Sequence, residues 1–134
     1  MCPSDGGVPQ AIPGDHETCV MAREILDRVG DKWSVLVIAL LGEGSQRFSE
    51  LKRSIDGISQ RMLTVTLRSL ERDGILTRTV HNVMPPHVSY ELTEMGTTLR
   101  EATAPLREWS VAHLARVDDA RAAYDARTDT RAAL

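Results

Sequence analysis

Aromatic residues are scarce in this sequence. Only 4% of its 134 residues are Phe, Trp or Tyr, and Gly and Pro number 9 and 6. Sandwiches and barrels need many short strands rich in aromatic and β-branched residues, joined by Gly- and Pro-rich turns. Leu, Arg and Ala are the most frequent residues here, and all three favour helices. The composition predicts a mainly α protein, and the length predicts one domain with tails.

Long apolar runs are also missing. The longest uninterrupted run, VLVIALL, extends from Val35 to Leu41, whereas a membrane span requires roughly 20 residues. The opening segment MCPSDGGVPQAIPGD contains no Lys or Arg and no apolar core, so it does not have the features of a secretory signal. We expect a cytoplasmic protein that does not associate with membranes, with residues 1–15 as a flexible leader.

Residues suited to catalysis or metal binding are few. Cys2 and Cys19 cannot form a disulfide framework, and both are expected to be reduced. No CxxC or HxxxH spacing occurs, so no metal site is expected. No phosphate-binding glycine loop or carboxylate pair is present, so we expect no cofactor and no catalytic residues. The enzyme hypothesis that remains is a thiol-dependent one using Cys19 with His16.

Helical spacing and capping residues predict four helices in the first part of the chain. The first helix is predicted within residues 15–30 and stops at Gly30, and the second begins at Asp31 and ends at Gly42 and Gly44. A short third helix is predicted within 46–57, closed by Gly57, and the fourth begins at Ser59 and runs to about Asp73. Asp31 and Ser49 are the expected N-caps of the second and third helices. The second helix is apolar on nearly every side, which indicates a position in the core.

A β-hairpin and a long helix are predicted next. The β-branched segments ILTRTVHNV and HVSYEL alternate in polarity and are joined across MPP, which predicts a hairpin. A long helix should begin at Thr93, and the tail over 118–134 loses the apolar pattern and should be frayed. This order predicts a winged helix-turn-helix domain over residues 16–117, in which the helix before the hairpin enters the DNA major groove.

The helix predicted over 59–73 has two different faces. Leu63, Leu67 and Leu70 fall on one narrow stripe at about 100° per residue, and they should attach the helix to the core. The opposite face carries arginines, a threonine and a valine, and these are Arg61, Thr64, Val65, Arg68 and Arg72. Arginine can bind guanine or phosphate, and Val or the Thr methyl can meet a thymine methyl. At the N-terminus, Ser59 and Gln60 can donate to phosphate.

Positive charge is concentrated around that helix. Residues 46–81 contain seven Lys or Arg and four Asp or Glu, a net charge of +3 in a chain whose formal net charge is −3. One interpretation is that these arginines are solvated helix formers. Together with the order of elements, however, the charge favours binding to double-stranded DNA.

The sequence resembles the HxlR family of bacterial winged helix-turn-helix regulators, which have a MarR-like fold. The resemblance is carried by three segments and the cysteine at position 19; the segments are GDKWSVLVI, RFSELKRSIDGISQRMLTVTLRSLERDGILTRTV and PPHVSYELTEMG. The resemblance implies a homodimeric DNA-binding regulator, commonly a repressor, with a pseudo-palindromic operator and a dimer formed by the first and last helices. It also implies that Cys19 matches a cysteine that senses oxidants or electrophiles in some members. Val65 stands where a polar residue is usual, His87 where Arg is usual, and Val20 where Pro is common.

The candidate site residues follow from these patterns. The candidate DNA-binding residues are Arg47, Ser59, Gln60, Arg61, Thr64, Val65, Arg68, Arg78 and His87. Near-heptad spacing relates Leu99, Ala102, Leu106 and Trp109, which predicts either a dimer interface or an intramolecular core. We favour the dimer because the stripe lies on the terminal helix.

Cys19 is the candidate redox-sensing residue. If Asp15 or Thr18 caps the first helix, the positive end of the helix dipole favours a thiolate at Cys19, and His16 is three residues away. Glu17 is adjacent, and a cysteine is often a small buried side chain instead. If Cys19 is a thiolate, a small-molecule or electrophile inducer is expected to act on it. A winged helix that binds only proteins remains a further alternative to a DNA-binding regulator.

Overall fold

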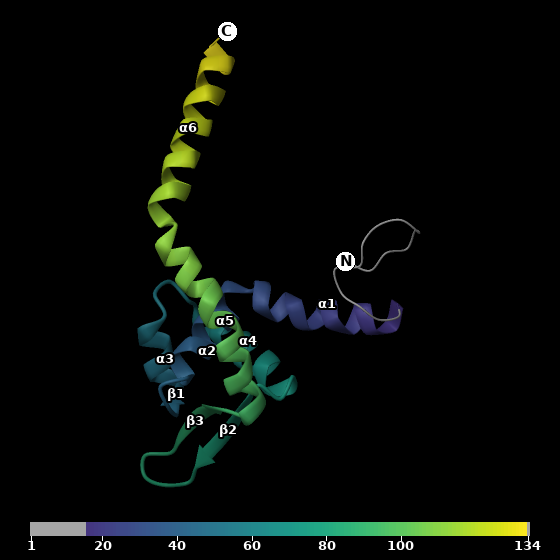
Figure 1. The fold of residues 1–134 in the computed structure, drawn as a ribbon. Coiled ribbons are helices and arrows are strands. Elements are labelled where there is room, and N and C mark those ends of the chain that lie inside the picture. The colour runs from purple at the N-terminus through teal and green to yellow at the C-terminus, as the bar shows by residue number, and fades with distance from the viewer. Residues whose placement is uncertain (1–15, 134) are drawn as a thin grey trace. The chain divides into compact units, whose positions relative to one another are not determined.

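The computed structural model describes residues 16–133, which include six helices and three strands (Figure 1). Their bounds are α1 His16–Gly30, α2 Lys32–Leu41, β1 Gln46–Arg47, α3 Phe48–Ser54, α4 Gln60–Arg72, β2 Leu76–His81, β3 His87–Leu92, α5 Glu94–Ala112 and α6 Leu114–Ala133. The chain divides after Arg100 into two compact units, which are treated separately below. The leader over residues 1–15, with Cys2, lies outside the described residues. None of the helices in the described range has the length and apolar content needed to cross a membrane.

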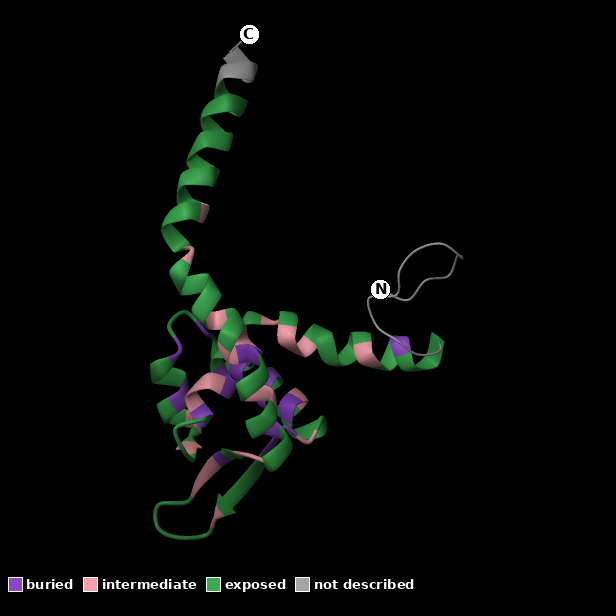
Figure 2. Ribbon diagram, viewed as in Figure 1, coloured by how far each residue is buried: buried purple, intermediate pink, exposed green. Residues whose placement is uncertain are grey.

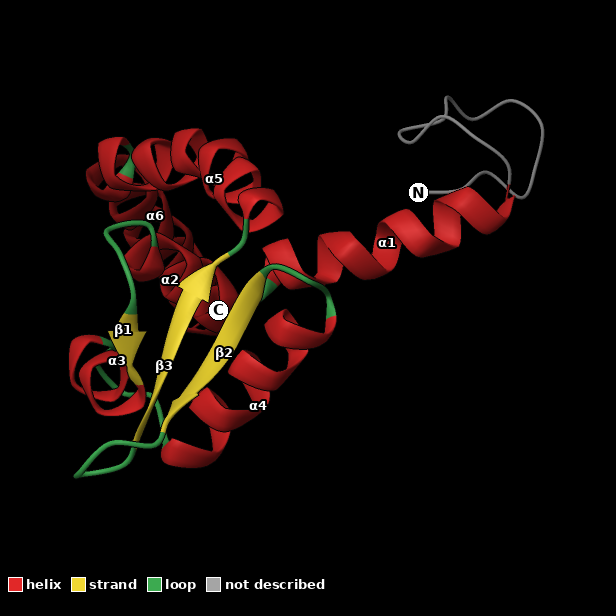
Figure 3. Ribbon diagram, turned by 90° about the horizontal axis from the view of Figure 1, so that it is seen from below, coloured by secondary structure: helices red, strands yellow, loops and turns green. Residues whose placement is uncertain are grey.

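The predicted hairpin forms, and a third strand joins it. The antiparallel sheet has the order β1-β3-β2, with Gln46 opposite Tyr90 and Arg78 opposite the same Tyr90 (Figure 3). β2 and β3 pair from Leu76 with Leu92 to His81 with His87. The mainly α fold with a hairpin wing is thereby confirmed, and the first unit has the element order of a winged helix-turn-helix.

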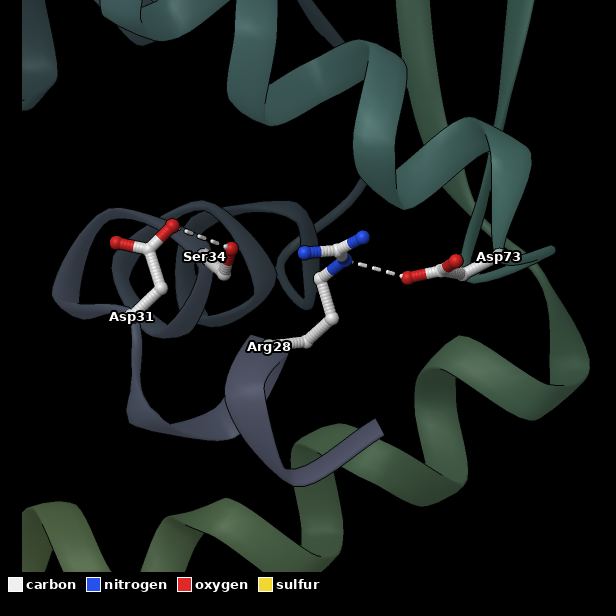
Figure 4. A network of polar contacts seen from close by, with 4 residues as sticks. All are labelled: Arg28, Asp31, Ser34 and Asp73. Carbon is white, nitrogen blue, oxygen red and sulfur yellow. Dashed lines mark hydrogen bonds and ion pairs between the residues drawn. The ribbon is translucent and has the colours of Figure 1, made fainter. Parts of the chain in front are cut away.

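The core of the first unit lies between α2, α3, α4 and the sheet. Asp31 caps α2 as predicted: its carboxylate accepts from Trp33 N at 3.2 Å and from Ser34 Oγ at 3.1 Å (Figure 4). The buried apolar residues are Val37, Ile38, Leu41, Leu51, Ile55, Ile58, Leu63, Leu67, Leu70, Ile75, Leu76 and Tyr90 (Figure 2). α2 faces the core with three of these residues, while Leu36 on its other side is exposed.

The prediction that Ser49 caps the third helix is wrong. Helix α3 begins one residue earlier, at Phe48, and Arg47 is its N-cap residue. The backbone N–H of Arg47 donates to Glu50 Oε1 at 3.1 Å, half of a capping-box arrangement that satisfies a backbone donor near the helix start. Pairing of Arg47 in β1 sets this earlier start, because the residue has extended backbone geometry in the strand.

Helix α4 matches its prediction closely. Ser59 is the N-cap, and its Oγ accepts from Met62 N at 3.1 Å. The three predicted leucines are all buried, with Leu67 the most exposed at 2%. Gly74 follows the C-cap at a φ of +77°, a left-handed conformation that glycine adopts without steric cost.

Thr93 joins the start of α5 to the turn between α4 and β2. Its Oγ1 donates to Gly74 O at 2.6 Å and accepts from Gly96 N at 3.0 Å, while its backbone N–H donates to Ile75 O at 3.0 Å. A Cβ at Gly96 would clash with the carbonyl oxygen of Ile75. Glycine is therefore required where α5 leaves the sheet.

The second unit contains the rest of α5 and helix α6. The sequence predicted a frayed tail over 118–134, but α6 is helical from Leu114 to Ala133. Its side chains from 118 to 129 are all exposed, so packing within the unit does not explain the helix. Ala and Arg recur along it, and their intrinsic helix propensity favours a helix without an apolar stripe.

We predict that Gly96→Ala destabilises the protein by about 1–3 kcal/mol, because the added methyl group has to displace the backbone at Ile75. Thermal or urea unfolding of the variant measures this cost. The matched control is Gly30→Ala, since nothing lies within 4 Å of a Cβ built at Gly30. Equal stability of the two variants would contradict the close contact at Gly96.

Candidate nucleic-acid interface

Helix α4 presents a basic face to solvent. Its leucine stripe packs inward, and α4 contacts α2 and β2. Arg61, Arg68 and Arg72 are consequently exposed, and Val65 between them is 50% exposed. None of these three guanidinium groups forms an ion pair or hydrogen bond with any residue in the range 16–133. They are therefore available to a ligand outside the chain.

The N-terminal turn of α4 uses part of its polar capacity internally. Ser59 Oγ accepts from the helix backbone, which leaves its O–H to donate elsewhere. Thr64 Oγ1 donates to Gln60 O at 2.8 Å, so the hydroxyl points along its own helix. Gln60 itself is exposed at the first position of the helix.

The register of the sheet places two other predicted DNA-binding residues, Arg47 and Arg78, on different faces. Residues directly opposite each other in antiparallel strands project to the same face, and successive residues alternate. Arg78 pairs with Tyr90, and Arg47 pairs with Ser89, one residue along β3. Arg78 and Arg47 therefore lie on opposite faces of the sheet. Sequence reasoning placed both at one DNA-binding surface and did not detect this separation.

His87 makes contacts within the wing that the sequence analysis missed. Its ring stacks on His81, with centroids 4.4 Å apart and planes at 19°. His81 Nε2 lies 2.7 Å from Ser89 Oγ, and His87 Nδ1 lies 3.3 Å from Pro85 O. His81 and His87 pair directly across the hairpin, which explains their stacking, and only the strand register reveals that pairing. Met84 at the tip, by contrast, is 92% exposed.

An ion pair connects α1 to the end of α4. Arg28 Nε lies 2.6 Å from Asp73 Oδ2, and both side chains are about one-third exposed (Figure 4). An exposed pair of this kind contributes at most about 1 kcal/mol to stability. Its position matters more, because Asp73 is the C-cap of α4 and Arg28 is in the last turn of α1.

Cys19 lies in the first part of α1 and is 1% exposed. Thr18 is inside the helix and is therefore not its N-cap, contrary to one of the two predicted caps. The other, Asp15, lies outside the described residues. Burial favours the interpretation of Cys19 as a packed side chain, because reactive thiols are usually partly exposed.

Apolar side chains are exposed on helices of both units. In the first unit, α1 exposes Met21, Ile25 and Leu26. In the second, Ala102, Leu106 and Trp109 are exposed, and the Trp109 ring stacks on His113 at 4.4 Å. Leu99 differs from the other predicted interface residues because it packs against the core of the first unit.

No group of three or more His, Cys, Asp or Glu side chains in residues 16–133 is arranged to hold a metal ion. The described polar groups instead form caps, turns and the surface of α4.

Comparison with known proteins agrees with this geometry. The sequence of residues 28–118 matches the HxlR-like helix-turn-helix family. The chain belongs to this family. It is 44% identical over 96 residues to the HTH-type transcriptional regulator YtfH of Escherichia coli K12, covering 72% of this chain and 76% of that one.

Solved structures show the same fold. The transcriptional regulator YtfH of Salmonella typhimurium superposes with a TM-score of 0.71 at 40% identity, over 75% of this chain and 89% of the other. The redox regulator HypR in its reduced form gives a TM-score of 0.67 at 37% identity, over 74% and 98%. The protein is therefore a helix-turn-helix transcriptional regulator and not an enzyme, as predicted. Cys19 precedes the segment that matches the family.

Proposed function

We propose that this regulator represses transcription by binding a pseudo-palindromic operator as a homodimer, with α4 in the major groove and the β2–β3 hairpin over the flanking backbone. The observation that carries the proposal is the exposed face of α4. Three arginines and Val65 project from it, and none of the arginines is neutralised by a described residue. Membership of a helix-turn-helix family supports the same role for this helix.

The side chains of α4 suggest which of them contact bases and which contact phosphate. Arg61 lies in the first turn of the helix and Arg68 about two turns further along, and the N-terminal part of this helix reads base edges in helix-turn-helix proteins. A guanidinium can donate two hydrogen bonds to guanine O6 and N7. Val65 between them offers an apolar contact to a thymine methyl. Ser59 and Gln60 then bind phosphate, together with unpaired N–H groups of the first turn.

The wing contributes through Arg78 and Arg47. Because they lie on opposite faces of the sheet, we assign Arg78 to the groove next to α4 and Arg47 to the backbone on the other side. His87 stacks on His81, so it shapes the hairpin and contacts phosphate only from that fixed position.

The proposed dimer uses the exposed apolar residues of the terminal helices. Ala102, Leu106 and Trp109 of α5 and Met21 and Ile25 of α1 are exposed in the single chain. Two-fold pairing of such surfaces removes them from water and brings two copies of α4 into one assembly. Leu99 belongs to the core and contributes only at the edge.

Signalling through Cys19 completes the proposal. HypR, a structural neighbour, is a redox regulator solved in reduced and oxidized forms, which supports a thiol signal here. Since Cys19 is buried, its reaction with an oxidant or electrophile requires movement of α1. Arg28 on the same helix contacts Asp73 at the end of α4, so a shift of α1 reaches the reading helix.

We predict that Arg61→Ala and Arg68→Ala each weaken operator binding by about 1–3 kcal/mol and relax the base preference at one position. Fluorescence anisotropy with an operator selected from random duplexes measures the affinity. Arg121→Ala on α6 removes the same charge elsewhere and should bind normally. Parent-like binding by both α4 variants would show that α4 is not the reader, as in the protein-interaction alternative.

We predict that Leu106→Glu and Trp109→Glu yield monomers, because a buried carboxylate at a two-fold interface lacks a partner. Sedimentation at micromolar concentration measures the assembly, and footprinting should show half-sites about one helical turn apart for the parent. Met84→Glu, on the hairpin tip, is the control and should remain dimeric. A monomeric parent would refute the dimer.

We predict that diamide or a quinone weakens operator binding of the parent and of Cys2→Ser but leaves Cys19→Ser unaffected. Modification at Cys19 changes the spacing of the two reading helices, and two half-sites bind tightly only when that spacing fits the groove repeat. Operator affinity before and after treatment is the measurement. If Cys19→Ser responds as the parent does, Cys19 is a packed side chain and not a sensor.

A further inference from the structure

A hollow of about 540 Å³ lies between α4, the sheet and the start of α3, entirely within the first unit. Figure 3 shows α4 running alongside the sheet in this region. The lining residues come from four elements, α3, α4, β2 and β3. They are Gln60, Thr64, Leu67, Arg68 and Glu71 of α4, Arg78, Val88 and Tyr90 of the hairpin, and Phe48 of α3.

The lining is apolar where it is buried and charged where it is exposed. Leu67 and Tyr90 are buried, and Phe48 and Val88 are partly buried. Phe48 is the chain's single Phe and Tyr90 is one of its two Tyr, so the hollow has an unusual share of the aromatic surface. Ligand pockets of about 300–1,000 Å³ commonly combine such an apolar lining with a few polar groups.

The charged lining residues favour an anion. Arg68 and Arg78 flank the hollow from α4 and β2, and with Glu71 they give a net charge of +1. In the part of the chain that the structure describes, neither arginine forms an ion pair or hydrogen bond. The sheet register supports this placement, since Arg78 lies opposite Tyr90 and shares its face.

The hollow is distinct from the outward face of α4. At about 100° per residue, Gln60, Thr64 and Glu71 lie on one side of the helix, and Arg61 and Arg72 lie roughly 80–100° further round. Arg68 stands at the boundary between the two surfaces. A molecule in the hollow would therefore occupy one arginine of the proposed DNA-reading face and leave the other two exposed.

We propose that this hollow binds a small planar aromatic carboxylate. The ring packs against Phe48, Leu67 and Tyr90, and the carboxylate accepts hydrogen bonds from Arg68 and Arg78. Guanidinium groups match carboxylates in planar, two-point geometry, and their hydrogen bonds to a charged acceptor are stronger than neutral ones. The Glu71 carboxylate repels any bound anion, and packing of the ring against the apolar lining offsets that repulsion for an aromatic carboxylate but not for a small inorganic anion.

The regulatory consequence rests on the proposed function. A carboxylate on Arg68 occupies a group assigned to the operator, so ligand and DNA bind competitively. By linkage, the ligand lowers operator affinity by the same factor by which the operator lowers ligand affinity. Such a compound would act as an inducer that reaches the reading helix directly.

The first test uses the full-length protein without DNA, titrated with 2-naphthoate by calorimetry. We expect saturable binding with one site per chain. Neutral 2-naphthamide tests the need for the carboxylate, and cyclohexanecarboxylate tests the need for the aromatic ring; both should bind roughly tenfold more weakly, the loss associated with one charge-assisted hydrogen bond or one aromatic contact.

Matched variants locate the site. Arg68→Gln and Arg78→Gln should each weaken 2-naphthoate binding roughly tenfold. Arg72→Gln, on the same helix but outside the hollow, should bind as the parent does. Thermal unfolding of each variant checks the fold, which these exposed side chains should not affect. Val88→Trp, which fills the hollow from the sheet side, should abolish binding and provides a second probe that leaves both arginines in place.

Several results would overturn the proposal: the absence of saturable binding, equal binding of 2-naphthamide, or equal losses in Arg72→Gln and Arg68→Gln. Operator anisotropy with and without 2-naphthoate then tests competition. If the protein binds 2-naphthoate but no DNA, the proposed function fails and the site stands. If it binds an operator but not 2-naphthoate, the site fails and the proposed function stands.

Discussion

The burial of one leucine stripe positions the rest of the candidate interface. Leu63, Leu67 and Leu70 attach α4 to α2 and to the start of β2, and each fully buried leucine contributes roughly 1.5–3 kcal/mol. Because a helix is rigid, fixing this stripe also fixes the direction of every other side chain on α4. The arginines are exposed as a result, and none of them forms an ion pair or hydrogen bond with a described residue.

Local capping and turn chemistry then determine where each element begins and ends. Asp31 and Ser59 cap the helices that follow them, Gly74 provides the left-handed residue after α4, and Thr93 joins that turn to α5. These interactions place the hairpin directly after α4, the proposed DNA-reading helix. The proposed DNA contacts and the proposed ligand hollow both depend on this placement, since β2 and β3 form one wall of the hollow and carry Arg78.

Regulation of this family member is proposed to involve two different inputs at one helix. A thiol signal at Cys19 would reach α4 through α1 and the Arg28–Asp73 pair, at its C-terminal end. An aromatic acid would act on the opposite side, at Thr64 and Arg68, without moving α1. The two proposed inputs would differ physically: the first would change the spacing of the two proposed reading helices, whereas the second would compete for a side chain proposed to read DNA.

The sequence alone determined the mainly α class, the order of elements, the cap at Asp31 and the bounds of α4, because each depends on local propensity and on the spacing of apolar residues. The resemblance carried by the segment from Phe48 to Thr79 identified the family. The tertiary structure decided the features that depend on partners distant in the chain. Pairing of Arg47 in β1 moved the start of α3, the strand register put Arg47 and Arg78 on opposite faces, and Leu99 packs against the core of the first unit. The Arg28–Asp73 pair joins residues 45 positions apart, and the hollow is lined by four separate elements, so no local pattern could have revealed either.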